Sequence, residues 1–414
     1  MNMIRSFRSA EPAPPHVRRA FFILAGATAA FGFAMAAQQN IVSNFFENDL
    51  GLKGPEFGYI TAIREIPGFL LIFLTALLYR LSLPHLTAVA MLLMAFGFGM
   101  FGFANSFWSV APFVIISSMG YHTWLQTQTA LGMSLTVESK SGSVLGRLAA
   151  INQAGALLAM AFVFVMFHFE LLDFKGTFIV CGILGLVAAA LVFRFPNMHN
   201  GEMLERKAER ERMVLKKDYD LYYKLSLLDG ARQQIFFSFG LWVLVDHFSL
   251  DVPAISLIML VTAFLAMITG PWIGRMIDLR GEKTMLGFVN IAYIVALLGY
   301  ARIDNTATAI VCYVIYSLIQ PLSAMGASVY LRKIAPSRDV APSLAMGITM
   351  QHAAAIVVPI VTGFVLNFVG YQIPFLVASG FALITVYITQ KLDPKAQKSA
   401  ARIAEEESLK IPAQ

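Results

Sequence analysis

Two adjacent charged residues, Arg64 and Glu65, stand inside an otherwise apolar stretch of the sequence. If that stretch crosses a membrane, a charge near its centre costs about 2.5 to 3.5 kcal/mol on insertion scales, so it normally has a partner or a function. The guanidinium group of Arg64 can bind an anion through its planar fork of donors. The carboxyl group of Glu65 can carry a proton. We therefore predict that Arg64 binds an anionic substrate and that Glu65 carries a coupling proton; the alternative is that both only pair with other helices.

Further polar residues lie in equally apolar surroundings. Asp246, beside His247, is expected at the outer end of its helix, where it either caps the helix or takes a gating or proton-binding role. His352 and His122 can relay protons near neutral pH or form hydrogen bonds to neighbouring helices; packing is favoured for His122, and the choice is open for His352. Uncharged candidates for the wall of a polar cavity are Gln39, Asn40, Gln126, Asn152, Gln320 and Gln351.

The composition indicates which elements must position these residues. Of 414 residues, 57% are hydrophobic and only 14% are charged, against about 25% charged residues in a typical soluble domain. This excludes an ordinary soluble enzyme and predicts an all-α integral membrane protein. Cys181 and Cys312 stand alone within apolar runs, and no phosphate-binding loop or zinc-ligand spacing occurs. We therefore expect no enzymatic activity, cofactor, metal or nucleic-acid partner.

Charge-poor windows predict twelve transmembrane helices in two groups of six. Two windows of double length are expected to break at Asn105-Ser106 and at Gly370-Tyr371. The seventh helix is expected to begin near Gln233, after a charged linker. The predicted units are a cytoplasmic N-tail (1–18), a first half (19–194), a cytoplasmic linker (195–231), a second half (232–391) and a cytoplasmic C-tail (392–414).

The distribution of basic residues predicts the orientation. With the N-terminus inside, inward segments hold 27 of the 31 Lys and Arg residues and outward loops hold three, Lys53, Lys175 and Arg302. Arg64 is the remaining one. Because cytoplasmic loops carry an excess of Lys and Arg, both termini are predicted to be cytoplasmic, in a multi-pass protein of the cytoplasmic (inner) membrane.

The two halves also resemble each other in sequence. At an offset of about 199 residues, residues 152–156 (NQAGA) align with residues 351–355 (QHAAA). At the same offset Leu145 aligns with Leu344. Six spans, a charged linker and six more spans therefore predict two structural repeats, as in secondary transporters.

A charged turn between the eighth and ninth spans carries the most specific motif, GRMIDLRGEK, at residues 274–283. It resembles the loop signature of the major facilitator superfamily, in which a glycine is followed by an acid four residues later and then by a glycine and basic residues. The matching positions are Gly274, Asp278, Gly281 and Lys283. This resemblance implies that the turn acts as an inner gate, where glycine permits close helix approach and the acid pairs with charges of the facing half.

The equivalent loop of the first half is degenerate. Thr75 and Tyr79 replace the first glycine and the acid, Ser82 replaces the second glycine, and only Arg80 is retained. The family's drug antiporters carry an arginine in span four and a proline in span five, and neither occurs here. These departures weaken a drug-efflux interpretation.

The resemblance implies a monomeric secondary active transporter that works by alternating access, with its site at the membrane midplane between the halves. From Arg64 and Glu65 we predict proton-coupled transport of a small anionic or zwitterionic organic solute. Two alternatives are open: proton-driven efflux of amphiphilic or toxic compounds, and a membrane sensor or assembly factor that does not transport.

Overall fold

The computed structural model of the chain describes residues 14–69, 81–136, 141–196 and 215–408. These residues form helices joined by short turns, with no β-strand among them. Nine helices in the described part are long and apolar enough to cross a membrane. The predicted all-helical, multi-pass membrane architecture is therefore confirmed.

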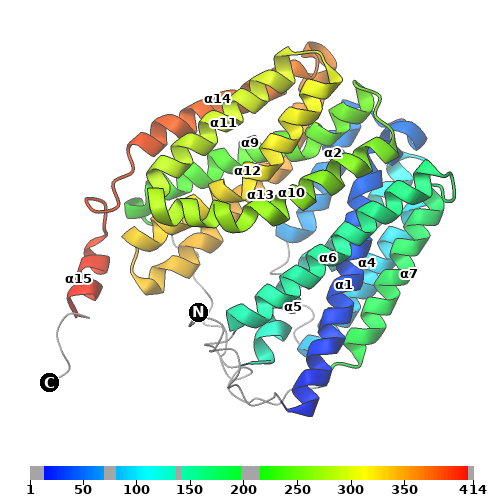
Figure 1. Ribbon diagram of the computed structural model, residues 1–414, viewed down its shortest axis with the longest axis horizontal. Coiled ribbons are helices and arrows are strands. Elements are labelled where there is room, and N and C mark those ends of the chain that lie inside the picture. Colours follow the sequence, from blue (N-terminus) through cyan, green and yellow to red (C-terminus); the bar gives the residue numbers. More distant parts are fainter. Residues whose placement is uncertain (1–13, 70–80, 137–140, 197–214, 409–414) are drawn as a thin grey trace.

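The N-terminal half is a bundle in which α1 packs against α6 and α7, and α4 against α5 and α7 (Figure 1). A π-helical segment, η2 (Phe45–Asp49), extends α1. The long helices of this half are α1 (Pro15–Asn44), α2 (Gly54–Phe69), α4 (Leu83–Phe101), α5 (Phe107–Ser134), α6 (Ser141–His168) and α7 (Phe174–Phe193).

The C-terminal half repeats this arrangement, with α9 packed against α12, α13 and α14, and α11 against α12 and α14. The short segment η4 (Lys217–Tyr219) precedes α9, and α15 (Ala400–Ser408) follows the bundle. The long helices are α9 (Asp220–Asp246), α10 (Val252–Arg280), α11 (Glu282–Arg302), α12 (Thr306–Ile334), α13 (Ser337–Val369) and α14 (Gln372–Gln390).

Three long helices are absent from the apolar nine: α2, α5 and α9. The described part of α2 has only 16 residues and contains Arg64 and Glu65. Helices α5 and α9 carry polar residues along their length, including His122 and Arg232. All three line the central cavity described below, which is why their sequences are less apolar than those of helices that face lipid.

Local sequence determines where the helices begin and end. Ser106 caps α5 in a reciprocal capping box with Ser109, a pairing that satisfies backbone amides at a helix start. The turn between α10 and α11 and the end of α13 use Gly281 and Gly370 at φ values of 77° and 73°, a region that glycine enters at little cost. The breaks predicted at Asn105-Ser106 and Gly370-Tyr371 match these helix ends.

The two halves contact each other through their second and fifth helices, α2 with α13 and α6 with α10. Figure 1 shows that the bundles meet at one end and diverge towards the end where the chain termini lie. We call these the distal end and the termini end. At the distal end the approach is close, because a Cβ atom on Gly58 would lie 2.3 Å from the carbonyl oxygen of Pro359. The contact therefore depends on glycine in α2.

The start of the seventh long helix differs from the expectation. Helix α9 begins at Asp220 rather than near Gln233, so its first turns come from the sequence assigned to the linker. The charges that suggested a linker include Asp229 and Arg232, which pair with each other inside the bundle. Charge content alone therefore placed the start of this helix too late in the sequence. Arg232, one of the 27 basic residues assigned to inward segments, is in fact buried.

Candidate functional site

A cavity of about 530 Å³ lies between the two halves, walled by residues of both. Four of the predicted site residues line it: Gln39 on α1, Arg64 and Glu65 on α2, and His122 on α5. Apolar and aromatic side chains make up much of the remaining wall. Further polar lining residues are Gln38, Ser43, Thr61, Ser117, Ser118, Tyr121, Gln234, Ser238, Thr262, Tyr313 and Ser317.

Arg64 and Glu65 form one end of a chain of polar contacts that crosses from one half to the other. Arg64 Nε lies 3.3 Å from Glu65 Oε1, and Glu65 Oε2 lies 3.5 Å from His352 Nδ1 on α13. Adjacent positions on a helix point about 100° apart, so the sequence did not require this pairing. The long arginine side chain nevertheless reaches its neighbour.

The exposure of the two side chains differs. The Arg64 side chain is 45% exposed, whereas that of Glu65 is 13% exposed. Among the described residues, the only side-chain partner of the Arg64 guanidinium group is at Nε, and the Arg64 side chain lines the cavity. The arrangement therefore offers a guanidinium fork for an incoming anion and a largely buried carboxylate behind it.

His122 completes the cluster. Its ring centroid lies 5.7 Å from that of His352, at an interplanar angle of 69°. Gly68 makes room for it, since a Cβ atom there would lie 2.6 Å from the imidazole. His122 Nε2 is buried and has no hydrogen-bond partner among the described residues. Two imidazoles and one carboxylate thus stand in sequence across the interface, a set of groups that can hold and pass a proton.

The other predicted candidates lie outside this cluster. Asn40 is buried at the contact between the halves, where its Oδ1 accepts a hydrogen bond of 2.8 Å from Ser256 of α10. Asn152 on α6 packs against the backbone at Gly32. Gln126 on α5 is exposed, and Gln320 on α12 is partly buried.

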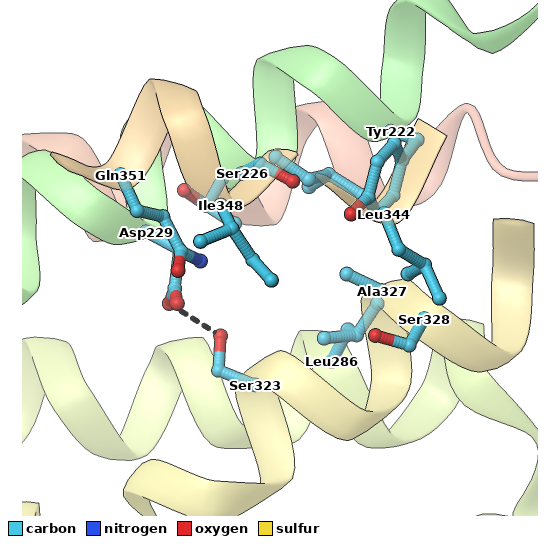
Figure 2. A pocket seen from close by; sticks show the side chains of 12 residues that line it. Tyr222, Ser226, Asp229, Leu286, Ser323, Ala327, Ser328, Leu344, Ile348 and Gln351 are labelled. Carbon is cyan, nitrogen blue, oxygen red and sulfur yellow. Dashed lines mark hydrogen bonds between the residues drawn. The ribbon is translucent and has the colours of Figure 1, made fainter. Parts of the chain in front are cut away.

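A second pocket, of about 280 Å³, lies within the C-terminal half and is lined by the candidate Gln351. Figure 2 shows the Asp229 carboxylate reaching towards Ser323, with which it shares a hydrogen bond of 2.6 Å. Tyr222 and Leu344, which come from the first turns of α9 and α13, lie at the other side of the pocket. The pocket therefore extends from the termini end towards the middle of the half.

Beside this pocket is a buried cation that the sequence reasoning missed. Arg232 is 0% exposed and forms an ion pair with Asp229 three residues earlier. Its other donors reach Asn290 Oδ1 at 2.8 Å and the Tyr316 hydroxyl at 3.1 Å, and the Tyr293 ring lies 3.7 Å from the guanidinium carbon. Arg64 is therefore not the only basic residue inside the bundle. The sequence signal for this pair was the spacing of three residues between the opposite charges of Asp229 and Arg232, just before an apolar run.

The predicted gate segment forms the end of α10, the turn at Gly281 and the start of α11. Lys283 Nζ donates to the carbonyl oxygen of Gln390 at the end of α14, at 2.6 Å. The side chains at Gly274 and Asp278 lie outside the part that the structure describes, as do Thr75, Tyr79 and Arg80 of the equivalent loop. The gate assignment therefore stays a prediction.

Two helical halves, joined through their second and fifth helices around a central cavity with charged and polar residues in its wall, are the architecture of membrane transporters built from structural repeats. The Major Facilitator Superfamily model matches residues 225–413. This match to the second half of the chain confirms the predicted resemblance to the superfamily. No curated protein matches the chain by sequence.

Several solved structures share the fold. A mutant form of the nucleoside transporter NupG has a TM-score of 0.76 at 16% identity, covering 90% of this chain and 99% of that one. A bacterial homologue of the human lysosomal transporter Spinster, inward-facing and occupied, has a TM-score of 0.71 at 12% identity, covering 94% and 100%. A D-xylose-proton symporter has a TM-score of 0.68 at 13% identity, covering 93% and 100%.

Proposed function

We propose that this protein is a proton-coupled secondary active transporter that moves a small anionic or zwitterionic organic solute by alternating access. The observation that carries the proposal is the chain from Arg64 through Glu65 to His352, which joins the two halves beside the central cavity. Arg64 lies ten residues after the first residue of α2, about 15 Å along the helix axis. That is roughly half the thickness of a bilayer core.

We further propose twelve spans in two six-helix repeats, with both termini cytoplasmic in the cell's inner membrane. The pairing of α2 with α13 and of α6 with α10 supports this, since each pair joins the second helix of one half to the fifth of the other. In that orientation the halves diverge towards the cytoplasm. The likeness to the inward-facing Spinster homologue supports the same state.

Charge balance then gives a coupling mechanism. In the empty cavity, Glu65 neutralises Arg64. A substrate carboxylate that binds Arg64 competes with Glu65 and leaves that carboxylate without its cation. A largely buried carboxylate that has lost its cation is costly, so anion binding favours uptake of one proton by Glu65 or by its remaining partner His352. The anion and the proton therefore bind together, and the substrate-bound site carries the same net charge as the empty site.

The direct test measures uptake of labelled organic anions and amino acids into proteoliposomes under an imposed pH gradient. Arg64→Ala removes the charge-assisted hydrogen bonds, worth about 1.5–3 kcal/mol, and should weaken binding by roughly 10- to 150-fold. Arg64→Lys keeps the charge and loses the fork, so we expect an intermediate effect. Arg302→Ala, at the exposed end of α11, is the matched control. Unchanged anion binding by Arg64→Ala would contradict the assignment.

Glu65→Gln tests the coupling separately. The neutral amide cannot exchange a proton, so we expect substrate exchange to persist while accumulation driven by the pH gradient is lost. Glu407→Gln, on the exposed C-terminal helix, is the control. Persistent pH-driven accumulation in Glu65→Gln would place the proton site elsewhere.

The alternatives give other results in the same assays. Efflux of amphiphilic compounds would depend on the aromatic cavity wall and would survive Arg64→Ala. A sensor or assembly factor would produce no flux with any substrate of the panel. The panel also includes nucleosides and D-xylose, because the NupG and D-xylose-proton symporter structures share the fold. Transport of those neutral solutes alone would overturn the choice of an anionic or zwitterionic substrate.

A further inference from the structure

The distal contact between the halves brings two acidic side chains together. Glu47, in η2 at the end of α1, and Asp246, the last residue of α9, belong to different halves and lie where η2 packs against α9, near enough for their carboxyl groups to interact. The two positions are separated by 199 residues, which is the offset of the internal repeat. They are therefore equivalent positions of the two repeats, meeting where the first helices of each half approach.

The two Glu47 oxygens have different partners. Glu47 Oε1 accepts a bond of 2.9 Å from Lys53 Nζ. Glu47 Oε2 is buried and receives no hydrogen bond from any donor of the described residues. A buried acceptor without a donor costs about 1–3 kcal/mol. The nearby Asp246 carboxyl group can supply a donor only if it is protonated.

The surrounding charges do not favour two ionised carboxylates. Lys53 is the cation at this contact, and its hydrogen bond to Glu47 raises the pKa of the Lys53 ammonium group. The Glu56 carboxylate accepts from the Lys53 backbone amide, and Asp49, facing Asp173, adds further negative charge. The His247 ring, beside Asp246, lies 2.9 Å from the Asp304 carboxylate and packs at a tilt against the Tyr371 ring, with the ring centroids 4.5 Å apart. One lysine thus faces more acids than it can neutralise.

We propose that Glu47 and Asp246 form an external proton-binding site, in which one shared proton holds the distal ends of the two halves together. Two carboxyl groups in contact share a proton because both cannot ionise at low cost. With the proton bound, the pair is held by an O–H···O bond and Lys53 compensates the remaining charge. When the proton is lost to the external solution, the two carboxylates repel each other across the contact. The distal end then opens towards the outside.

This proposal deepens the proposed alternating access, on which it rests, and it does not depend on the identity of the substrate. It assigns proton sensing at the outer face to a pair that is distinct from Glu65. The distal contact includes other pairs that do not titrate, such as the bond of 2.9 Å from Asn44 Nδ2 to the carbonyl oxygen of Leu250. Opening is therefore expected to depend on pH in a graded manner.

The test measures opening as the rate at which an external, membrane-impermeant maleimide labels a cysteine in the cavity. Ser43→Cys supplies the thiol, since Ser43 lines the central cavity and is itself buried. Leu171→Cys, in an exposed loop, supplies a reference thiol that corrects for the pH dependence of the reagent. Intact cells expressing the full chain expose only the outer face. Both native cysteines are buried and need not be removed.

We expect the corrected labelling rate to rise with external pH, by up to about tenfold per pH unit, the limit for release of one proton. Asp246→Asn and Glu47→Gln place a permanent neutral donor at the contact and should each make labelling slow and independent of pH. Asp251→Asn, at the start of α10, should keep the wild-type profile. A wild-type profile in both Asp246→Asn and Glu47→Gln would overturn the proposal.

The outcome is separable from that of the proposed transport function. In one outcome, Glu65→Gln loses pH-driven accumulation while Asp246→Asn keeps the wild-type labelling profile. This result would support proton coupling and reject the external site. A protein without flux whose labelling follows pH, and loses that dependence in Asp246→Asn, would retain the external site and reject the transport proposal.

Discussion

The buried pair of Asp229 and Arg232 allows a quantitative prediction of stability. Asp229→Ala removes the counter-ion of a guanidinium group that is 0% exposed. Breaking a buried ion pair by removing one partner costs about 3–5 kcal/mol, because the remaining charge is left uncompensated. Arg232 would keep its bonds to Asn290 and Tyr316. We therefore expect a loss near the lower limit, about 3 kcal/mol.

A second ion pair on the same helix provides the matched control. Asp220 and Lys224 are 2.5 Å apart, but their side chains are 54% and 55% exposed. Exposed pairs contribute about 0–1 kcal/mol, so Asp220→Ala should hardly change stability. Both variants shorten an aspartate of α9 to alanine, which isolates the effect of burial.

The assay is unfolding of the purified full chain in detergent, followed by intrinsic tryptophan fluorescence as denaturant is increased. The double variant Asp229→Leu with Arg232→Met should recover most of the loss of Asp229→Ala, because replacing both partners by apolar groups is often neutral. If Asp229→Ala costs no more than Asp220→Ala, the reasoning from burial is wrong.

Two further predictions concern the ends of the bundle. Gly58→Leu would force α2 away from the carbonyl oxygen of Pro359 and should speed external labelling of the cavity. Gly380→Leu has open space around its Cβ position and should leave the labelling rate unchanged. Equal labelling rates in the two variants would contradict this prediction. At the termini end, hydrogen bonds from Ser337 lower the pKa of Glu405, so this contact is present at neutral pH and is lost as pH falls through that lowered pKa. Amide protection of α15 in hydrogen exchange should therefore decline only in acid, at pH values below the ordinary glutamate pKa of about 4.3. Glu405→Gln should weaken the protection at neutral pH, and protection that stays constant on acidification would show that Glu405 does not hold α15.

Much of the architecture could be predicted from local sequence. Apolar runs long enough to cross a bilayer indicate the helices, and the Ser106 capping box and Gly370 end them where the sequence indicated. The same reasoning failed at the start of α9, because the paired charges Asp229 and Arg232 resemble a solvated linker when their partners are unknown. Only the packing of the surrounding helices shows that these two charges are buried and paired inside the bundle.

By itself, the sequence determined the helical class, the resemblance to a transporter family and the scarcity of charge inside the bundle, since these depend on residue type and on spacing along one helix. Tertiary structure decided which of those charges meet. Glu65 contacts His352 and Glu47 approaches Asp246 across the interface between the halves, and no periodicity within a single helix contains that information. Such contacts depend on how each helix is rotated and shifted against its neighbours, which packing of the whole bundle sets.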